Sequence, residues 1–472
     1  MSPSAWAWAG KRVAVAGIGV AGFACADALM QRGALVTILD SSDGEKQRER
    51  AQILEILGAK IVLGKPPKLP ADTGLLVVSP GVPPAAPVIA EAHARGVAVW
   101  GEFELAWQLR GPDPAKWLFV SGTNGKTTTT LMLESMLAAS GRRTAAVGNI
   151  GVSLVEAVTS GIPFDALAIE VGAPQLPFLF SASPLASVCL NVAPDHLDHF
   201  GSLPAYMAAK GRVYNLTQKA CIYNVADPAT EKMVEEAEVV EGCRAVGFTL
   251  GAPRVSMLGV VDDVLVDRAF IHNRSTHAQE LATIADVQPG APHQVANALA
   301  AAALARACGV SPAAVRDGLR AFIPAAHRIA EVATISGVRY IDDSKATNGH
   351  AAATSLKAYD SVVWIAGGLA KGQQFDDLVE DNAGRLRGAV LLGQDRKVIR
   401  QALARHAPEV PVLEVAETDT GAMTSVVRLA SGMARPGDTV LLAPGCASWD
   451  MFRDYAARGE AFAAAVNALE RP

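Results

Sequence analysis

The order of hydrophobic and polar positions divides the chain into short apolar runs that alternate with longer amphipathic stretches. Residues 11–40 set the pattern: an apolar run (KRVAVAG), a glycine turn, a helical stretch (VAGFACADALMQRG) and a second apolar run ending at Asp40. Strands that alternate with helices in this way predict parallel sheets covered by helices. The chain is therefore predicted to be an α/β protein.

The alternation falls into three blocks. The stretch RGPDPAK (110–116) predicts a linker after the first block. In the second block, residues 256–270 predict a β-hairpin turning at Asp262–Asp263. Two helices follow, and Ser311 is the predicted N-cap of the second. The third block begins near His327 with the strand GVRYIDDS and ends in an amphipathic helix. We predict three domains in series: a Rossmann-like domain (1–110), a P-loop ATPase-like domain (111–324) and a second Rossmann-like domain (325–472).

Composition narrows the class of protein. Half of the 472 residues are hydrophobic and 19% are charged, which is enough apolar material for about three cores. The net charge is −5 and no basic run stands out, so nucleic acid is not an expected partner. The most apolar helical stretch (296–309) contains Arg306 and is too short to span a bilayer. The N-terminus lacks the order of a secretory signal, and the six cysteines have no CxxC or metal spacing. We expect a cytoplasmic monomer with mostly buried cysteines.

The first candidate for chemistry is GIGVAG (17–22), which lies between a predicted strand and a predicted helix. Its glycines permit a tight turn that lets backbone N–H groups approach a pyrophosphate at the helix N-terminus. Asp40 ends the next strand about twenty residues on, as in dinucleotide sites. By itself the motif is compatible with NAD, with another nucleotide or with a structural glycine turn.

The second candidate is SGTNGKTT (121–128), a shortened P-loop between the strand WLFVSG and a helix. The general pattern has a glycine where this chain has Val120, and Gly122 stands three residues before Gly125. Backbone N–H groups and Lys126 still suit phosphates, and the Thr127 hydroxyl suits Mg²⁺. A fortuitous glycine turn is the alternative.

GTNGKTT resembles the ATP loop of the Mur ligases and folylpolyglutamate synthases, which form amide bonds through an acyl phosphate. Later segments resemble further motifs of the same superfamily in the same order: GNIG (148–151), NVAPDHLDHF (191–200), AYMAAKGRVY (205–214), AAHR (325–328), YIDDSKATN (340–348), GGLAKG (367–372) and LLAPGCASWDMFRDYAARG (441–459). The N-terminal glycine-loop domain with SPGVP excludes the folate enzymes, which lack that domain. DDSKATN and APGCAS are most similar to the D-glutamate-adding branch of the Mur ligases.

The resemblance implies an ATP-dependent ligase that adds D-glutamate to UDP-N-acetylmuramoyl-L-alanine in peptidoglycan precursor synthesis. The first glycine loop would then bind the uridine diphosphate of the UDP-sugar rather than NAD. Implied ATP positions are Gly122, Asn124, Gly125, Lys126, Thr127, Thr128, Asn297, Arg328 and Asp343. Implied positions for the UDP-sugar peptide and the amino acid are Gly19, Val20, Asp40, Ser41, Ser79, Gly81, Asn149, Gln175, Lys345, Thr347, Lys371, Ser448 and Tyr455.

The resemblance also implies two Mg²⁺ ions and a carbamylated Lys210. The expected catalytic residues are Lys126, Glu170, His196 and Lys210, and the expected metal ligands are Thr127, Glu170, His196 and Lys210. Without the resemblance, His196 could be a satisfied core histidine and Lys210 a solvated helix residue. Lys371 would be a loop lysine and Ser448 a candidate N-cap. The C-terminal domain is expected to close on the others, because its ligands are far from the P-loop in sequence.

The sequence departs from the family pattern after Glu170. The family usually continues with Leu-Ser-Ser and an aromatic, whereas this chain has Val171 and then Gly172, Ala173 and Pro174. Three other interpretations therefore stay open: a paralogous ligase for another amino acid or carboxylate, a nucleotide-regulated binding protein without catalysis, and a nicotinamide-binding oxidoreductase. The last would leave the P-loop and DDSKATN without a role.

Overall fold

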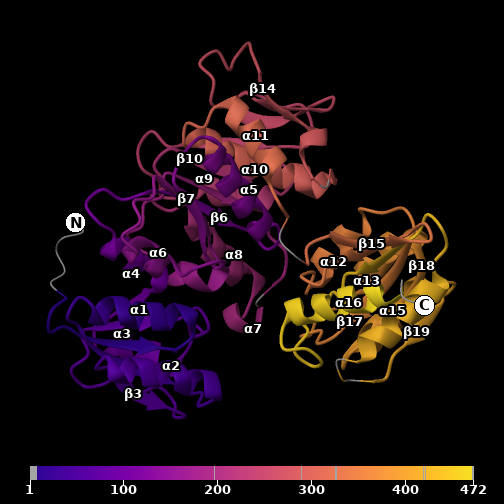
Figure 1. Cartoon of the computed structure of the whole chain (residues 1–472). Coiled ribbons are helices and arrows are strands. Elements are labelled where there is room, and N and C mark those ends of the chain that lie inside the picture. Colours follow the sequence, from indigo (N-terminus) through magenta and orange to yellow (C-terminus); the bar gives the residue numbers. More distant parts are fainter. Residues whose placement is uncertain are drawn as a thin grey trace. The chain divides into compact units, whose positions relative to one another are not determined.

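The computed structural model describes residues 8–195, 197–288, 290–324, 327–417, 419 and 421–469. The chain forms two compact units, Met1–Phe322 and Ile323–Pro472. The first unit contains two sheets and the second contains one, so each predicted domain has a sheet of its own (Figure 1). The boundary proposed between residues 110 and 111 falls inside the first unit and stays a prediction.

The first sheet is parallel, in the order β3-β2-β1-β4-β5. Its strands are β1 (Arg12–Ala16), β2 (Leu35–Asp40), β3 (Lys60–Leu63), β4 (Leu75–Val78) and β5 (Ala98–Gly101), and its helices are α1 (Val20–Met30), α2 (Glu45–Ile56), α3 (Pro87–Ala94) and α4 (Glu102–Leu109). Along β1, Val13 and Val15 pack with α1 and α2, whereas Ala14 and Ala16 pack with α3. Both faces are therefore buried, as expected of a parallel strand.

The second sheet has nine strands in the order β14-β13-β12-β11-β10-β9-β6-β8-β7. Its strands are β6 (Lys116–Ser121), β7 (Thr144–Gly148), β8 (Ala166–Glu170), β9 (Ala186–Cys189), β10 (Ala220–Asn224), β11 (Arg244–Phe248), β12 (Met257–Val261), β13 (Val264–Asp267) and β14 (Gln279–Thr283). Its helices are α5 (Lys126–Ala139), α6 (Leu154–Thr159), α7 (Leu197–Phe200), α8 (Leu203–Gly211), α9 (Pro228–Glu235), α10 (Pro292–Ala307) and α11 (Pro312–Ala321), with 3₁₀ turns at η2 (Ala173–Phe178), η3 (Arg212–Tyr214) and η4 (Ile284–Asp286).

Strand β6 joins two hydrophobic cores. Trp117 and Phe119 belong to a core that also contains residues of α1 and α4, whereas Leu118 and Val120 belong to a core with α5, α10 and α11. The shared core explains why residues 1–322 form one unit. Helices α10 and α11 lie beside α5 (Figure 1). The contact with α11 depends on Gly318, where an added Cβ would come within 2.5 Å of the Met136 Cα.

The third sheet has the order β15-β16-β20-β17-β18-β19, with β15 antiparallel to β16. Its strands are β15 (Ala330–Ile335), β16 (Val338–Asp342), β17 (Val362–Gly367), β18 (Leu386–Leu392), β19 (Val412–Glu414) and β20 (Thr439–Leu442), and its helices are α12 (Gly349–Leu356), α13 (Asp376–Asn382), α14 (Arg396–His406), α15 (Ala422–Met433) and α16 (Tyr455–Leu469), with a 3₁₀ turn η5 (Ala383–Arg385). Trp364 faces the core with α12–α14, and Ile365 faces the core with α15 and α16.

Several local predictions are confirmed. Strands β12 and β13 form the hairpin, with Val261 opposite Val264 across the Asp262–Asp263 turn. The Ser311 side chain accepts a hydrogen bond from the Ala314 N–H, so it is the N-cap of α11. Five of the six cysteines are buried. Within the described residues, none of the helices combines the length and apolar character needed to cross a bilayer.

The hydrophobic pattern did not predict β5, β11, β14 or β15, and one candidate cap is wrong. Strand β15 precedes the predicted first strand of the third block, and β14 is an edge strand with the polar start Gln279–Glu280. A strand at the edge of a sheet needs only one apolar face, so its hydrophobic pattern in the sequence is weak. Ser448 does not cap α16, because that helix begins at Tyr455.

Candidate active site

The turn after β6 is a phosphate-loop in shape. Gly122 and Gly125 have φ angles of 147° and 82°, which side chains rarely adopt, and Gly125 is the N-cap of α5. The loop is fixed from the neighbouring strand β9, since the Asn124 N–H donates to the Asn191 Oδ1 at 2.9 Å. The backbone N–H groups at the start of α5 are thus presented at the carboxyl edge of the sheet, where anions bind helix N-termini.

Three side chains converge beside this loop. The Thr127 hydroxyl donates to the Glu170 Oε2 at 2.7 Å, and the Asn149 amide donates to the Glu170 Oε1 at 3.1 Å. Glu170 is buried at the end of β8, directly beside β6. Lys126 folds over the loop and donates to the carbonyls of Gly122 and Thr123, each at 2.9 Å. The Thr127 hydroxyl and the Glu170 carboxylate supply oxygen ligands of the kind that Mg²⁺ prefers.

Lys210 is a buried lysine near the end of α8, with 1% of its surface exposed. Its ammonium lies 4.9 Å from the centre of the Tyr206 ring, and the Tyr206 hydroxyl is within 3.0 Å of the Thr123 hydroxyl in the P-loop. Burial, together with a smaller effect of Lys126, lowers the pKa of Lys210 to about 7, while Cys189 and Asp195 oppose the shift. The interpretation of Lys210 as a solvated surface residue is therefore wrong.

The N-terminal glycine loop lines a cavity of about 610 Å³ within the first unit. Gly22 allows α1 to approach the loop, since a Cβ there would lie 1.9 Å from the Gly17 carbonyl oxygen. Asp40 braces the loop by accepting the N–H groups of Ile18 and Ser42, both at 2.8 Å. The cavity is lined by both domains of this unit, at Gly17, Gly19, Val20, Ala21, Leu39, Asp40, Ser41, Ser42, Pro67, Ser79, Pro80, Gly81, Val82, Glu102, Gly148, Asn149, Ile150, Gly151, Ser153 and Gln175.

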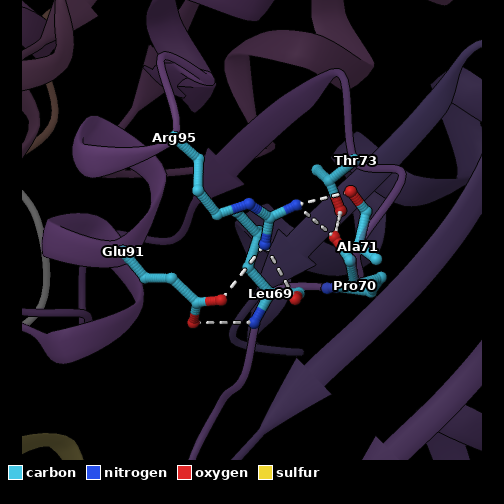
Figure 2. A network of polar contacts seen from close by, with 6 residues as sticks. All are labelled: Leu69, Pro70, Ala71, Thr73, Glu91 and Arg95. Carbon is cyan, nitrogen blue, oxygen red and sulfur yellow. Dashed lines mark hydrogen bonds and ion pairs between the residues drawn. The ribbon is translucent and has the colours of Figure 1, made fainter.

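A polar network fixes the segment that follows Pro67 in the cavity wall (Figure 2). The Arg95 guanidinium donates to the carbonyls of Leu69, Pro70 and Ala71 at 3.0, 2.7 and 2.8 Å. Glu91 pairs with Arg95 at 3.1 Å and accepts the Leu69 N–H at 3.2 Å. The loop between β3 and β4 is thus held to the end of α3, although its own residues form no helix or strand.

Two buried carboxylates of α4 hold turns of the middle domain. Glu102 accepts the Leu154 N–H at 2.7 Å, at the start of α6 and next to the turn that lines the cavity. Glu104 accepts the N–H groups of Phe180 and Ser181 at 2.8 and 2.9 Å. Both carboxylates are 2% exposed. The motif analysis missed them because their partners lie 52 to 77 residues away.

The C-terminal unit brings together three loops, which follow the adjacent strands β16, β20 and β17. The Gly445 N–H donates to the Ala346 carbonyl at 2.8 Å, and Leu369 and Ala447 exchange backbone hydrogen bonds at 2.9 and 3.0 Å. These loops carry the predicted amino-acid positions Lys345, Thr347, Lys371 and Ser448. The structure therefore places these positions at one edge of the third sheet.

Two lysines of these loops rest on aromatic rings. The Lys345 ammonium lies 3.8 Å from the centre of the Tyr455 ring, and the Lys371 ammonium lies 4.1 Å from the Trp449 ring. Trp449 is 65% exposed, which is unusual for so large an apolar side chain. The motif analysis named Ser448 and passed over this neighbour.

The predicted nucleotide positions of this unit lie near its start. Asp343 is buried and accepts a hydrogen bond from the Ser355 hydroxyl. Burial raises the pKa of Asp343 to about 6, against the opposing effects of Ser355 and Arg328.

In the first unit, Asn297 of α10 reaches the P-loop, since a Cβ on Gly125 would lie 2.5 Å from its Oδ1. His196 lies outside the described residues.

Known protein families match nearly the whole chain. Residues 11–101 match the Mur ligase MurD-like N-terminal domain, residues 120–305 the Mur ligase middle domain, and residues 327–446 the Mur ligase glutamate ligase domain. The UDP-N-acetylmuramoylalanine--D-glutamate ligase of Streptomyces avermitilis is 59% identical over 98% of this chain and 99% of its own. The enzymes of the same name from Thermobifida fusca and Mycolicibacterium smegmatis are 55% and 44% identical over 98% and 97% of this chain and 99% and 97% of their own.

The chain belongs to the Mur ligase family. Solved structures of Mur ligases have the same fold at low identity. A UDP-N-acetylmuramate-alanine ligase from Thermotoga maritima superposes with a TM-score of 0.58, at 18% identity over 98% of this chain and all of its own. A second ligase from that organism, solved with ADP, gives 0.56 at 16% identity over 92% and 95% of the two chains. The predicted fold, three α/β domains in series, and the predicted family are confirmed.

The contacts of Glu102 predict a loss of stability in Glu102→Ala. The variant leaves the buried Leu154 N–H without its acceptor, which typically costs about 1–3 kcal/mol. We expect the free energy of unfolding to fall by this amount in urea titrations. The control is Glu156→Ala on the exposed face of α6, which should stay within about 0.5 kcal/mol of wild type. Equal effects of the two substitutions would contradict the assignment.

The burial of Glu102 also predicts how the free energy of unfolding depends on pH. Burial raises the pKa of Glu102 above its ordinary value of 4.5, against hydrogen bonds from Ser153, Leu154 and Val155. The folded protein therefore holds this proton more tightly than the unfolded chain, and its stability falls as pH rises from about 4.5 through the raised pKa. Glu102→Gln carries no such proton, so its stability should decline less over that window. Parallel stability curves for the two proteins would refute this.

Proposed function

We propose that the protein joins D-glutamate to the alanine carboxylate of UDP-N-acetylmuramoyl-L-alanine, with conversion of ATP to ADP and phosphate through an acyl phosphate. The relatives of this name at 44–59% identity support the choice of substrates. The observation that carries the proposal is Asn149, which lines the cavity and also donates to the carboxylate that accepts from Thr127. A single residue thus connects the cavity of the first glycine loop to the second phosphate loop.

The first glycine loop and its cavity are the proposed site of the UDP-sugar. Its N–H groups at the start of α1 suit a diphosphate, and Asp40, Ser41, Ser79 and Gly81 line the same cavity. The second loop is the proposed ATP site, where Lys126 places fixed positive charge beside the phosphates. Asn149 and Gln175, on the P-loop side of the cavity, would hold the peptide end of the substrate near the nucleotide.

The donor set beside the P-loop fits Mg²⁺. The Thr127 hydroxyl and the Glu170 carboxylate already converge within 2.7 Å, and such hard oxygen ligands are those that Mg²⁺ prefers, together with phosphate oxygens. Bound Mg²⁺ would supply Lewis-acid charge to the phosphates. Among the described residues no three His, Cys, Asp or Glu side chains form a metal cluster, and Mg²⁺ usually keeps several waters beside its protein and phosphate ligands.

Lys210 is the proposed carbamylated lysine. Uptake of CO₂ requires a neutral amine, and burial in this site favours that form. The resulting carbamate would add a negative charge near Lys126, which lies close enough to Lys210 to affect its pKa. Its proposed role, together with His196, is to hold the second Mg²⁺.

The three loops of the C-terminal unit are the proposed site of the amino acid. Lys345 and Lys371 are cations that suit the two carboxylates of glutamate, and Ser448 and Thr347 supply hydroxyl groups. Asp343 and Arg328 are proposed to contact the nucleotide. The alanine carboxylate of the UDP-sugar substrate reacts first with the γ-phosphate of ATP, which releases ADP. The amine of glutamate then attacks the acyl phosphate and releases phosphate.

The Gly172-Ala173-Pro174 departure lies in the turn between Glu170 and Gln175. The Gln175 Oε1 accepts the Gly172 N–H at 2.6 Å, and a Cβ at residue 172 would lie 2.9 Å from that oxygen. We propose that this hydrogen bond replaces the positioning role of the missing serine hydroxyls. The relatives favour D-glutamate as the amino acid in spite of the departure.

The function is tested with a panel of amino acids and UDP-N-acetylmuramoyl-L-alanine, by phosphate release and product mass. We expect turnover only with ATP, Mg²⁺ and D-glutamate together. With ¹⁸O in the alanine carboxylate, one label should appear in the released phosphate, because the acyl phosphate transfers that oxygen. Turnover with another amino acid would favour the paralogous ligase, and tight NADH binding that no UDP-sugar displaces would favour the oxidoreductase.

The P-loop geometry predicts a difference between two glycines at opposite ends of α5. Alanine at Gly125 or Gly141 meets the same left-handed backbone, which costs about 1–2 kcal/mol. Only at Gly125 does the added Cβ meet a neighbour, the Asn297 Oδ1. We expect Gly125→Ala to weaken MgATP binding at least about tenfold in calorimetry, a change of about 1.4 kcal/mol. Gly141→Ala should bind as wild type, and equal affinities of the two would exclude this loop as the ATP site.

If Lys210 is carbamylated, activity should be lost when CO₂ is removed from the solution and should return when bicarbonate is added back. The rate of this recovery depends on pH. Because the pKa is about 7, the neutral fraction of the amine rises between about pH 6 and pH 8 and then levels off. At equal concentrations of dissolved CO₂, the rate of recovery should follow this curve. A lysine with the ordinary pKa of 10.5 would instead gain about tenfold per pH unit beyond pH 8.

Substitution completes this test. Lys210→Ala should lose nearly all turnover and regain part of it with acetate or propionate, which restore a carboxylate in the emptied space. The control is Lys232→Ala on α9, whose lysine is exposed. Full activity of Lys210→Ala would remove Lys210 from the site.

A further inference from the structure

Arg458 is a buried cation to which neither the motif comparison nor the proposed reaction gives a role. It lies on α16, and 1% of its surface is exposed. Burial lowers the pKa of Arg458 to about 10, although Cys446, Asp450 and Asp342 oppose the shift. Among the described residues no carboxylate forms an ion pair with it, so the cost of burying this charge has to be offset by its hydrogen bonds.

Those hydrogen bonds reach all three loops at the carboxyl edge of the third sheet. The Nε and an Nη of Arg458 donate to the hydroxyl and carbonyl of Ser344, at 2.9 and 2.8 Å. The other Nη donates to the carbonyls of Cys446 and Gly367, at 3.1 and 3.5 Å. A planar guanidinium with five N–H groups can bridge acceptors that diverge in this way, whereas an ammonium presents its donors from one point.

Each acceptor stands a short distance from a proposed amino-acid ligand. Ser344 precedes Lys345, and its hydroxyl also donates at 2.7 Å to the carbonyl of Tyr455, whose ring carries the Lys345 ammonium. Cys446 lies two residues before Ser448, and Gly367 lies four before Lys371. Arg458 itself is too buried to meet a substrate carboxylate.

We infer that Arg458 is a positioning residue for the amino-acid substrate: its guanidinium fixes the loops 343–348, 367–372 and 444–449 relative to one another and so sets the affinity for glutamate. This inference rests on the proposed function. Backbone hydrogen bonds still join the loops when Arg458 is changed, so the domain retains a basis for folding. The expected defect is therefore in the spacing of Lys345, Lys371 and Ser448.

The test compares Arg458→Lys with Arg387→Ala. Arg387 pairs with the buried carboxylate of Asp438 at 3.1 Å, near the amino ends of β18 and β20, and thus serves as a structural control at the opposite edge of the same sheet. We expect Arg458→Lys to raise the KM for D-glutamate at least about tenfold, or about 1.4 kcal/mol. Its KM for ATP should rise less, because of the proposed nucleotide contacts only Asp343 lies in these loops. Its KM for the UDP-sugar should stay within about twofold. Arg387→Ala should lower the Tm and leave all three KM values near wild type.

Two further measurements separate positioning from simple loss of structure. Hydrogen exchange of the full-length protein, without substrates, should become faster in the three loops in Arg458→Lys and not in Arg387→Ala. Guanidinium ion at a concentration too low to unfold the protein should lower the KM for D-glutamate in Arg458→Ala. Unchanged loop exchange and an unchanged KM in Arg458→Lys would overturn the inference, as would a general increase in exchange shared with Arg387→Ala.

The same design distinguishes this inference from the proposed function. If the wild-type protein turns over with another amino acid, the KM comparison is made with that amino acid, and the role of Arg458 is decided there. If no amino acid supports turnover, the proposed function fails. The exchange measurement then decides alone whether Arg458 orders the loops.

Discussion

The Glu170 carboxylate is the constraint on which the first unit's site depends. It is buried at the end of β8, where one oxygen accepts from Thr127 of the P-loop and the other accepts from Asn149 of the cavity wall. A carboxylate in such a place needs partners for both oxygens, because burial without them is costly. The two donors come from loops that follow different strands, so satisfying Glu170 also fixes one loop relative to the other. Glu170 therefore links the two proposed substrate sites.

Three other buried charged residues also join separate segments of the chain. Glu102 and Glu104 accept backbone N–H groups across the junction between the first two domains, and Arg458 donates to carbonyls of three loops. In each case a charged side chain bonds to backbone atoms, which are present whatever the side chains of the loop are. Hydrogen bonds to charged groups are stronger than neutral ones, at about 1.5–3 kcal/mol. Such residues hold irregular segments in place where helices and strands cannot.

The sequence predicted what local chemistry determines. The P-loop, the Asp262–Asp263 hairpin and the Ser311 cap depend on residues a few positions apart, and the fold class follows from alternating apolar runs. Strand β14 and the roles of Glu102 and Arg458 were not predictable in this way. The partners of Glu102 and Arg458 lie far along the chain, up to 114 residues for Arg458 and Ser344. The burial of Lys210, which the pattern alone would have placed in solvent, likewise follows from packing that only the structure shows.

The arrangement of the strands explains why one chain carries two proposed phosphate loops. Both follow a strand with parallel neighbours on each side, β1 between β2 and β4 and β6 between β8 and β9. Ligands of open α/β sheets bind beyond the carboxyl ends of such strands, so each sheet supplies one cradle. The third sheet repeats this rule with the loops after β16, β17 and β20. The first sheet differs from the others in the role of its acidic residue Asp40, at the end of β2. Each of the two Asp40 carboxylate oxygens accepts a backbone N–H group, and the bond from Ile18 braces the first glycine loop. Asp40 therefore helps to hold the glycine turn that lines the cavity.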